Sequence, residues 1–122
     1  MKPSSPPRIV SFHDPVERSE TAPAADRLLG GAPRQLIENH YAEGTGQFFS
    51  GVWSSTPGKW RVSYTEHEFC HLLCGSIAIE SDAGERYRFA AGDSFVIPSG
   101  FSGTWEVLED VRKLYAIFEP SR

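Results

Sequence analysis

The stretch that decides the fold is Gly92-Asp93-Ser94-Phe95-Val96-Ile97-Pro98-Ser99-Gly100. It places a short apolar run between two corners, and the glycines and the proline supply the backbone conformations that tight corners need. Asp93 follows the first glycine, and its carboxylate is expected to cap the turn. A short strand between two tight corners is typical of a small antiparallel β structure.

The segments around this stretch show the period of β-strands. Large and polar side chains alternate over 60–64, 76–80, 86–89 and 104–107, and 114–118 is a final apolar run. A turn is expected over 81–85. Turn signals about every ten residues predict an all-β sandwich or barrel with about seven or eight strands, starting near Phe48, and no long helix.

Length and charge limit the classes of function. The chain has 122 residues, which is the length of one domain. Lys and Arg total 12 against 16 Asp and Glu, a net charge of −4, so there is no basic surplus for nucleic acid. We found no apolar run able to cross a membrane and no secretory signal. We therefore expect a cytoplasmic protein that binds neither nucleic acid nor membrane.

The front of the chain differs from the rest. It is rich in proline, and every aromatic residue except Phe12 lies at Tyr41 or later. A segment with so little apolar surface cannot form a core of its own. The sequence predicts an extended Pro-rich N-terminal arm over 1–33, with one short helical turn near Asp26–Leu29, and a single β-barrel domain over 34–122.

One motif suggests a zinc peptidase, but its context excludes it. His67-Glu68-Phe69-Cys70-His71 fits H-E-x-x-H, which needs a helix to bring the two imidazoles within about 5–6 Å. On a strand, residues four apart are separated by about 13 Å. The flanking alternation predicts a strand, so both histidines are expected to point outward. The same separation excludes a disulfide between Cys70 and Cys74.

The spacing Glu68-x6-Gly75, followed by G-D-x4-P-x-G, resembles the two motifs of the cupin superfamily. That resemblance implies a double-stranded β-helix, or jelly-roll cupin barrel. Further stretches resemble the small cupins of the (S)-ureidoglycine aminohydrolase cupin-domain type, with ethanolamine-utilisation cupins as near relatives. They are Gly51-Val52-Trp53, Gly58-Lys59-Trp60, Glu68-Phe69-Cys70, Gly103-Thr104-Trp105-Glu106-Val107-Leu108-Glu109 and Arg112-Lys113-Leu114-Tyr115. The resemblance covers about residues 48–119.

The superfamily implies a metal site of three histidines and one glutamate. Here the histidine positions carry Val62, Tyr64 and Gly103, and only Glu68 remains. Gly103 is expected to leave space where a ligand histidine would stand. A single carboxylate does not hold a transition metal tightly. We therefore expect no cofactor and no tightly held metal; if a divalent metal does bind, Glu68 is its candidate ligand.

Strand parity predicts which side chains share the barrel interior. If Glu68 points inward, Cys70, Leu72 and Cys74 point the same way, while the pattern leaves the directions of Lys113 and Tyr115 open. Glu68 is the candidate catalytic residue. The candidate ligand-binding residues are Trp60, Tyr64, Cys70, Trp105, Lys113 and Tyr115.

Three functions remain open. A carboxylate in an aromatic barrel needs a cation, a hydrogen-bond donor or a proton, so Glu68 could bind an amine, act in acid–base catalysis, or be a buried strut paired with Lys113 or Tyr64. The leading hypothesis is a cupin that binds a small polar or amine-containing molecule without a tightly held metal. The alternatives are a metal-dependent hydrolase or isomerase of small nitrogen compounds, as the resemblance implies, and a dimerising structural module. A homodimer is expected, and whether the chain is an enzyme is left open.

Overall fold

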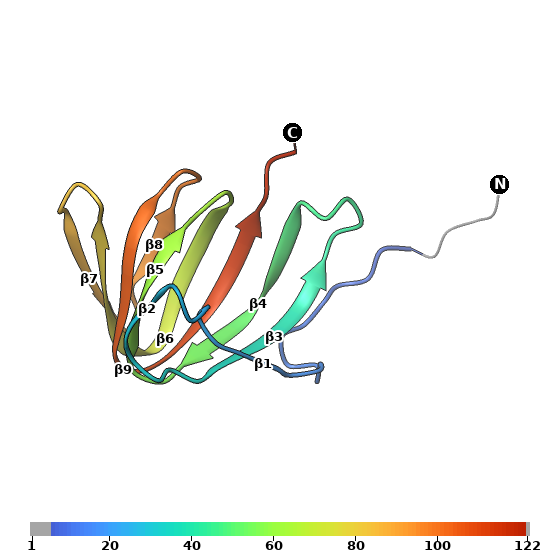
Figure 1. Ribbon diagram of the computed structural model, residues 1–122. Helices are drawn as coiled ribbons and strands as arrows, with labels where there is room; N and C mark the ends of the chain where they lie inside the picture. Colours follow the sequence, from blue (N-terminus) through green and yellow to red (C-terminus); the bar gives the residue numbers. More distant parts are fainter. Residues whose placement is uncertain (1–5, 122) are drawn as a thin grey trace.

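A computed structural model describes residues 6–121, which form one curled antiparallel sheet (Figure 1). Its strands are β1 (Ser19–Thr21), β2 (Leu28–Gly31), β3 (Gln35–Ala42), β4 (Phe48–Ser55), β5 (Gly58–Ser63), β6 (His67–Ser81), β7 (Arg86–Ala90), β8 (Ser94–Ile97) and β9 (Ser102–Phe118). The all-β jelly-roll prediction is confirmed, with nine strands in place of seven or eight. Across 6–121 there is no helix, and hence none long and apolar enough to cross a membrane.

Two long strands organise the sheet. β6 and β9 pair with each other along most of their length, and each joins segments that the sequence pattern shows as separate runs. The other edge of β9 pairs with β4 and β5, and the other edge of β6 pairs with β7 and β8. The sheet therefore curls around one interior (Figure 1).

Two strands come from the segment assigned to the N-terminal arm. β1 pairs with β3, and β2 pairs with β5, so residues 19–31 extend the barrel sheet. Between them, the amides of Arg27 and Leu28 both donate to the carbonyl oxygen of Ala24, at 2.9 and 3.2 Å, which forms a turn. The helical turn predicted near Asp26–Leu29 is therefore right only in part, because Leu28 and Leu29 lie in β2. Residues 6–10 reach away from the barrel (Figure 1), and Ile9 is 95% exposed.

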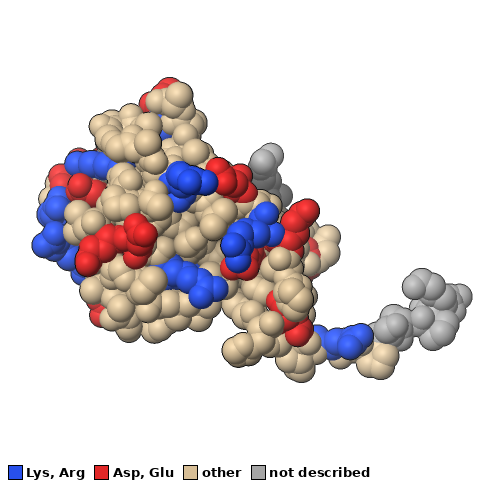
Figure 2. Space-filling view, turned by 90° about the horizontal axis from the view of Figure 1, so that it is seen from below, with Lys and Arg blue, Asp and Glu red and all other residues tan. Residues whose placement is uncertain are grey.

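The interior is filled by alternate side chains of the two long strands and their neighbours. Burying an aliphatic or aromatic side chain contributes about 1.5–3 kcal/mol relative to leaving it exposed, so this cluster is the main source of stability. Its members are Trp60, Leu72, Ile77, Ile79, Ile97, Trp105, Val107 and Val111. On the outside, Figure 2 shows acidic and basic side chains intermixed over the face seen from below.

The corners around β8 form as the sequence predicts. Gly92 and Gly100 both have φ of +93°, a conformation that side chains with a Cβ rarely adopt. The carboxylate of Asp93 accepts a hydrogen bond from the amide of Ala90 at 2.8 Å, which caps the first corner. These two corners place β8 beside β6, with Glu68 opposite Ile97.

Two predictions, the inward direction of Cys74 and the free space at Gly103, are wrong. Cys74 is exposed, because the pairing of β6 with β9 shifts register between Leu72 and Ser76 and reverses the parity. Gly103 leaves no space for a histidine: a Cβ there would lie 2.0 Å from the carbonyl oxygen of Glu80 on the adjacent strand. Both cysteines are free, as expected from their separation.

Candidate functional site

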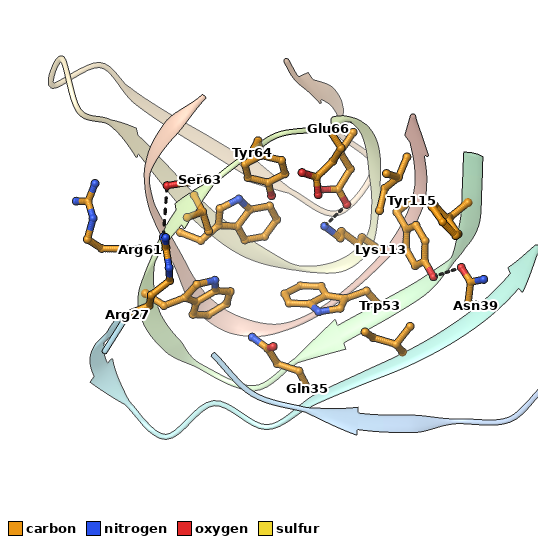
Figure 3. Close-up of a pocket in the computed structure, with 17 residues that line it drawn as sticks. Arg27, Gln35, Asn39, Trp53, Arg61, Ser63, Tyr64, Glu66, Lys113 and Tyr115 are labelled. Atoms are coloured by element: carbon orange, nitrogen blue, oxygen red, sulfur yellow. Dashed lines mark hydrogen bonds and ion pairs between the residues drawn. The ribbon is translucent and has the colours of Figure 1, made fainter. Parts of the chain in front are cut away.

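The concave face of the sheet holds an open cavity of about 590 Å³ (Figure 3). This volume is typical of sites for small molecules, which range over about 300–1,000 Å³. All three tryptophans of the chain line it. The other lining residues are Arg27, Gln35, Ile37, Asn39, Phe49, Arg61, Val62, Ser63, Tyr64, Glu66, Glu68, Lys113, Tyr115 and Ile117.

A buried ion pair lies on the wall of this cavity. The Nζ atom of Lys113 on β9 is 2.7 Å from Oε2 of Glu68 on β6, and both side chains are 6% exposed. The same ammonium lies 3.6 Å from Sγ of Cys70. The carboxylate thus has the cationic partner that its burial requires, supplied by the chain itself. The direction of Lys113, which the sequence pattern leaves open, is therefore inward.

Two indole faces complete the surroundings of the ammonium. Nζ of Lys113 lies 4.7 Å from the ring centre of Trp53 and 4.6 Å from that of Trp105. Both distances are within the range of cation–π attraction, which is strongest away from water. The sequence suggested that a cationic ligand could occupy this position beside Glu68 and the tryptophans. In the structure, Lys113 occupies it.

Burial and the charges of the ion pair together shift the pKa values around the cavity. Burial by itself lowers the pKa of Lys113, but the negative charge of Glu68 and the hydrogen bond to it more than offset this, and the pKa is raised. Burial raises the pKa of the Cys70 thiol to about 12, although Lys113 opposes the shift. Burial, and then the charge of Glu68, raises the pKa of Tyr64 well above its ordinary value. Lysine is therefore charged at neutral pH, and the thiol and phenol are neutral.

A second polar pair lies further along β9. The hydroxyl of Tyr115 donates to Oδ1 of Asn39 on β3 at 2.6 Å, and Nδ2 of Asn39 donates to the carbonyl oxygen of Tyr41 at 3.1 Å. Gly51 makes room for this contact, because a Cβ there would lie 2.6 Å from the Tyr115 hydroxyl. Burial raises the pKa of Tyr115 to about 12. Tyr115 is therefore a neutral hydrogen-bonding group of the cavity wall.

Most of the predicted site residues meet in this cavity. Those that line it are Trp60, Tyr64, Glu68, Trp105, Lys113 and Tyr115. Cys70 does not line it: the residue has no exposed surface and touches Lys113 from within the wall. The two histidines of the H-E-x-x-H pattern lie on strand β6, where His67 is exposed while Glu68 is buried, so the motif does not form a metal site.

Several cavity residues were not predicted from the sequence. Gln35 begins β3 and is 6% exposed, and Asn39 lies on the same strand. Arg27 comes from the turn before β2, and its guanidinium donates to Oγ of Ser63 at 3.4 Å. Glu66 precedes β6. These positions precede the alternating pattern or fall in turns, so their sequence gives no signal of where they point.

The metal site that cupins imply does not fit these side chains. No group of three potential ligands among His, Cys, Asp and Glu comes together anywhere in 6–121. The one carboxylate at the expected position already bonds an ammonium at 2.7 Å. A dication there would meet the positive charge of Lys113 at close range. The donor set is therefore unsuited to a transition metal.

A curled jelly-roll sheet with a cavity on its concave face defines a cupin barrel. The chain belongs to the EutQ-like cupin domain family, which it matches over residues 42–115. No curated protein matches it. The predicted kinship with ethanolamine-utilisation cupins is thereby confirmed, whereas the ureidoglycine aminohydrolase type stays a prediction.

Solved structures share the fold at low identity. A DUF861 protein of unknown function from Pseudomonas syringae pv. tomato is 22% identical over 88% of this chain with a TM-score of 0.77; the chain spans 46% of that protein's length. A DUF861 family protein from Thermotoga maritima is 31% identical over 52% of this chain and 73% of its own, with a TM-score of 0.52. A putative ethanolamine utilization protein Q from Salmonella typhimurium is 17% identical over 88% of this chain and 100% of its own, with a TM-score of 0.65.

Proposed function

We propose that the barrel binds a small polar organic molecule in the aromatic cavity, without a tightly held metal. The observation that carries this proposal is the open volume of about 590 Å³ between aromatic rings and buried polar groups. Protein interiors are close-packed, so a barrel that served only as a scaffold would fill this space with side chains. A cavity that combines rings with a few polar groups is the usual form of a small-molecule site.

Binding is better supported than catalysis. Glu68 is the candidate catalytic residue, but its carboxylate is held by Lys113, which favours the role of a strut that shapes the cavity. The metal-dependent hydrolase or isomerase of the ureidoglycine type has the family resemblance in its favour and no metal-binding set within the described cavity. An amine ligand would compete with Lys113 for Glu68. The proposed ligand is therefore a polar molecule of any class, and amines are one of the classes to be tested for binding.

Intrinsic fluorescence tests the proposal directly, because every tryptophan of the chain lines the cavity. The full chain is titrated with millimolar amines, amides, sugars and carboxylates, and the melting temperature is measured in parallel. We expect saturable fluorescence changes and a raised melting temperature for at least one class. N-acetyltryptophanamide controls for collisional quenching. If no class changes either signal, the proposal is overturned.

A further inference from the structure

One mostly buried side chain of the cavity wall, that of Gln35, leaves its polar atoms open to the cavity. Gln35 is 6% exposed and lines the cavity, yet its side chain makes no hydrogen bond to any of residues 6–121. Its main chain is fixed by pairing with Thr21 and Ser55 on the two adjacent strands. Its amide atoms are accessible from the open cavity and are therefore available to bond a molecule that enters it. The structure thus holds a free donor and a free acceptor at a fixed place.

The direction and surroundings of this amide point to a ligand. Figure 3 shows the Gln35 carboxamide directed into the cavity beside Trp53. The two other tryptophans also line the cavity, and flat π-faces favour contact with flat groups. A carboxamide presents an N–H donor next to a C=O acceptor, and it pairs with a ligand edge that offers the complementary adjacent groups.

The charges of the cavity argue for an uncharged ligand. The buried carboxylate of Glu68 and the buried ammonium of Lys113 neutralise each other at 2.7 Å. The indole faces that attract cations, those of Trp53 and Trp105, are already used by Lys113. Arg61 forms an ion pair with Asp82 at 2.8 Å. Arg27 and Glu66 also line the cavity without an ion-pair partner in residues 6–121, but they have opposite signs, and Arg27 is exposed and Glu66 half-buried. The fully buried part of the wall therefore offers hydrogen bonds and ring surface, with its charges paired.

We propose that the ligand is an uncharged planar molecule that carries a hydrogen-bond donor next to an acceptor on one edge, as a lactam ring does. Gln35 pairs with that edge, and the tryptophan rings contact the face of the molecule. This inference rests on the proposed function, because it assigns a chemical class to the ligand of the same cavity. It makes Gln35 a specificity-determining residue.

A pair of matched probes tests the inference. 2-Pyridone carries the donor–acceptor edge, and N-methyl-2-pyridone has lost the donor but keeps the flat ring. NMR titration of the full chain should show 2-pyridone binding at least about fivefold more tightly, the lower end for a bidentate pair. Gln35→Met should remove this preference. Gln47→Met, the same substitution in the β3–β4 turn, should keep it, and ethylammonium should bind more weakly than 2-pyridone.

The remaining outcomes of these titrations distinguish failure of the inference from failure of the proposed function. Equal affinity of the wild-type chain for the two pyridones overturns the inference, even if Gln35→Met fails to fold. An unchanged preference in a folded Gln35→Met variant, or tighter binding of ethylammonium, also overturns it. If neither pyridone binds while another class binds in the fluorescence titration, the inference fails and the proposed function stands. If nothing binds in either experiment, both fail.

Discussion

At the scale of single residues, the buried polar groups define the cavity, and the sequence predicts only some of them. Alternation places Trp60, Glu68 and Trp105 inside, because every second residue of a strand faces the same side and the large side chains indicate which side is buried. It cannot place Lys113, since Arg112 and Lys113 are adjacent and either could be the solvated charge. The choice depends on the register of β9 against β6, which is a long-range property.

Removing the ammonium should destabilise the barrel strongly. Lys113→Met leaves the buried carboxylate of Glu68 without its partner, and breaking a buried pair in this way costs about 3–5 kcal/mol. Urea denaturation followed by circular dichroism measures the free energy of unfolding. Adding Glu68→Gln should recover part of the loss, because the buried negative charge is then absent.

The neighbouring residue provides the matched control for that measurement. Arg112 is 52% exposed and lies 3.7 Å from Glu38, and exposed ion pairs contribute about 0–1 kcal/mol. Arg112→Met should therefore lower stability by about 1 kcal/mol or less. Equal losses in the two single variants would contradict the account of Lys113 as a buried partner.

The two thiols should differ sharply in reactivity. Cys70 is buried and its pKa is raised to about 12, so it carries almost no thiolate at neutral pH. Cys74 is exposed. A disulfide reagent such as DTNB should therefore modify one thiol per native chain and two in denaturant. Cys74→Ser should remove the native reaction, and rapid native modification of both thiols would show that Cys70 is accessible.

At the scale of elements, irregular pairing limits what alternation can predict. The register of β6 against β9 shifts at three points between Leu72 and Ile77. Parity counted from Glu68 is therefore right up to Leu72 and wrong at Cys74. The position of such bulges depends on the partner strand, so a single strand's sequence does not show them. Likewise β3 was not predicted, because its residues do not alternate strictly.

The pairing of β9 with its neighbours depends on one glycine. A Cβ at Gly103 would lie 2.0 Å from the carbonyl oxygen of Glu80, which is backbone and cannot rotate away. Gly103→Ala should therefore cost about 1–3 kcal/mol or more through strand displacement. Gly44→Ala is the control, since nothing lies within 4 Å of its Cβ position. Thermal or urea unfolding that ranks the two variants equally would contradict the close approach.

At the scale of the whole molecule, the cupin motifs predict the fold well and the cavity incompletely. The corners at Gly92 and Gly100 fix β8, and the rest of the barrel follows from strand spacing. The front segment is different, because residues 19–31 become strands through contacts with β3 and β5 and not through a pattern of their own. That is why Arg27 reaches the cavity without a sequence signal; Gln35 lies on β3, opposite Thr21 of this segment.

Stability should fall at alkaline pH. Cys70, Tyr64 and Tyr115 have raised pKa values in the native protein. These groups therefore ionise at a lower pH in the unfolded chain, and as the pH rises their ionisation stabilises the unfolded chain relative to the native one. The raised pKa of Lys113 acts in the same direction, since its favourable charge is lost as pH rises through the native value. The stabilisation is fully present below the ordinary thiol pKa of 9.0 and is lost toward about 12.

Urea denaturation across this range checks the expectation. The free energy of unfolding should change little from about pH 7 to 8 and decline steadily above about pH 9. Cys70→Ala should have a shallower decline, because one of the titrating groups is absent. A free energy that stays constant up to about pH 11 would contradict the burial of these groups.

The outer face of the sheet bears on the predicted homodimer. Phe69 is 45% exposed and Val96 is 60% exposed, and the two are direct cross-strand partners on β6 and β8. Phe48 and Phe118, also partners, are 39% and 47% exposed on β4 and β9. Adjacent strands thus carry apolar side chains outward, and contiguous exposed apolar patches usually mark interfaces. We propose that a second copy of the chain covers this face.

Light scattering coupled to size exclusion tests that proposal. The full chain should elute with the mass of a dimer, and the double variant Phe69→Glu with Val96→Glu should elute as a monomer with an unchanged circular dichroism spectrum. Charges placed on an apolar interface would be buried without partners, which is why dissociation is expected. Leu29→Glu is the control, because Leu29 is 54% exposed on β2, which pairs with β5 and with none of the four strands that carry the patch. A wild-type monomer at micromolar concentration, or a double variant that remains dimeric, would rule out this face as the interface.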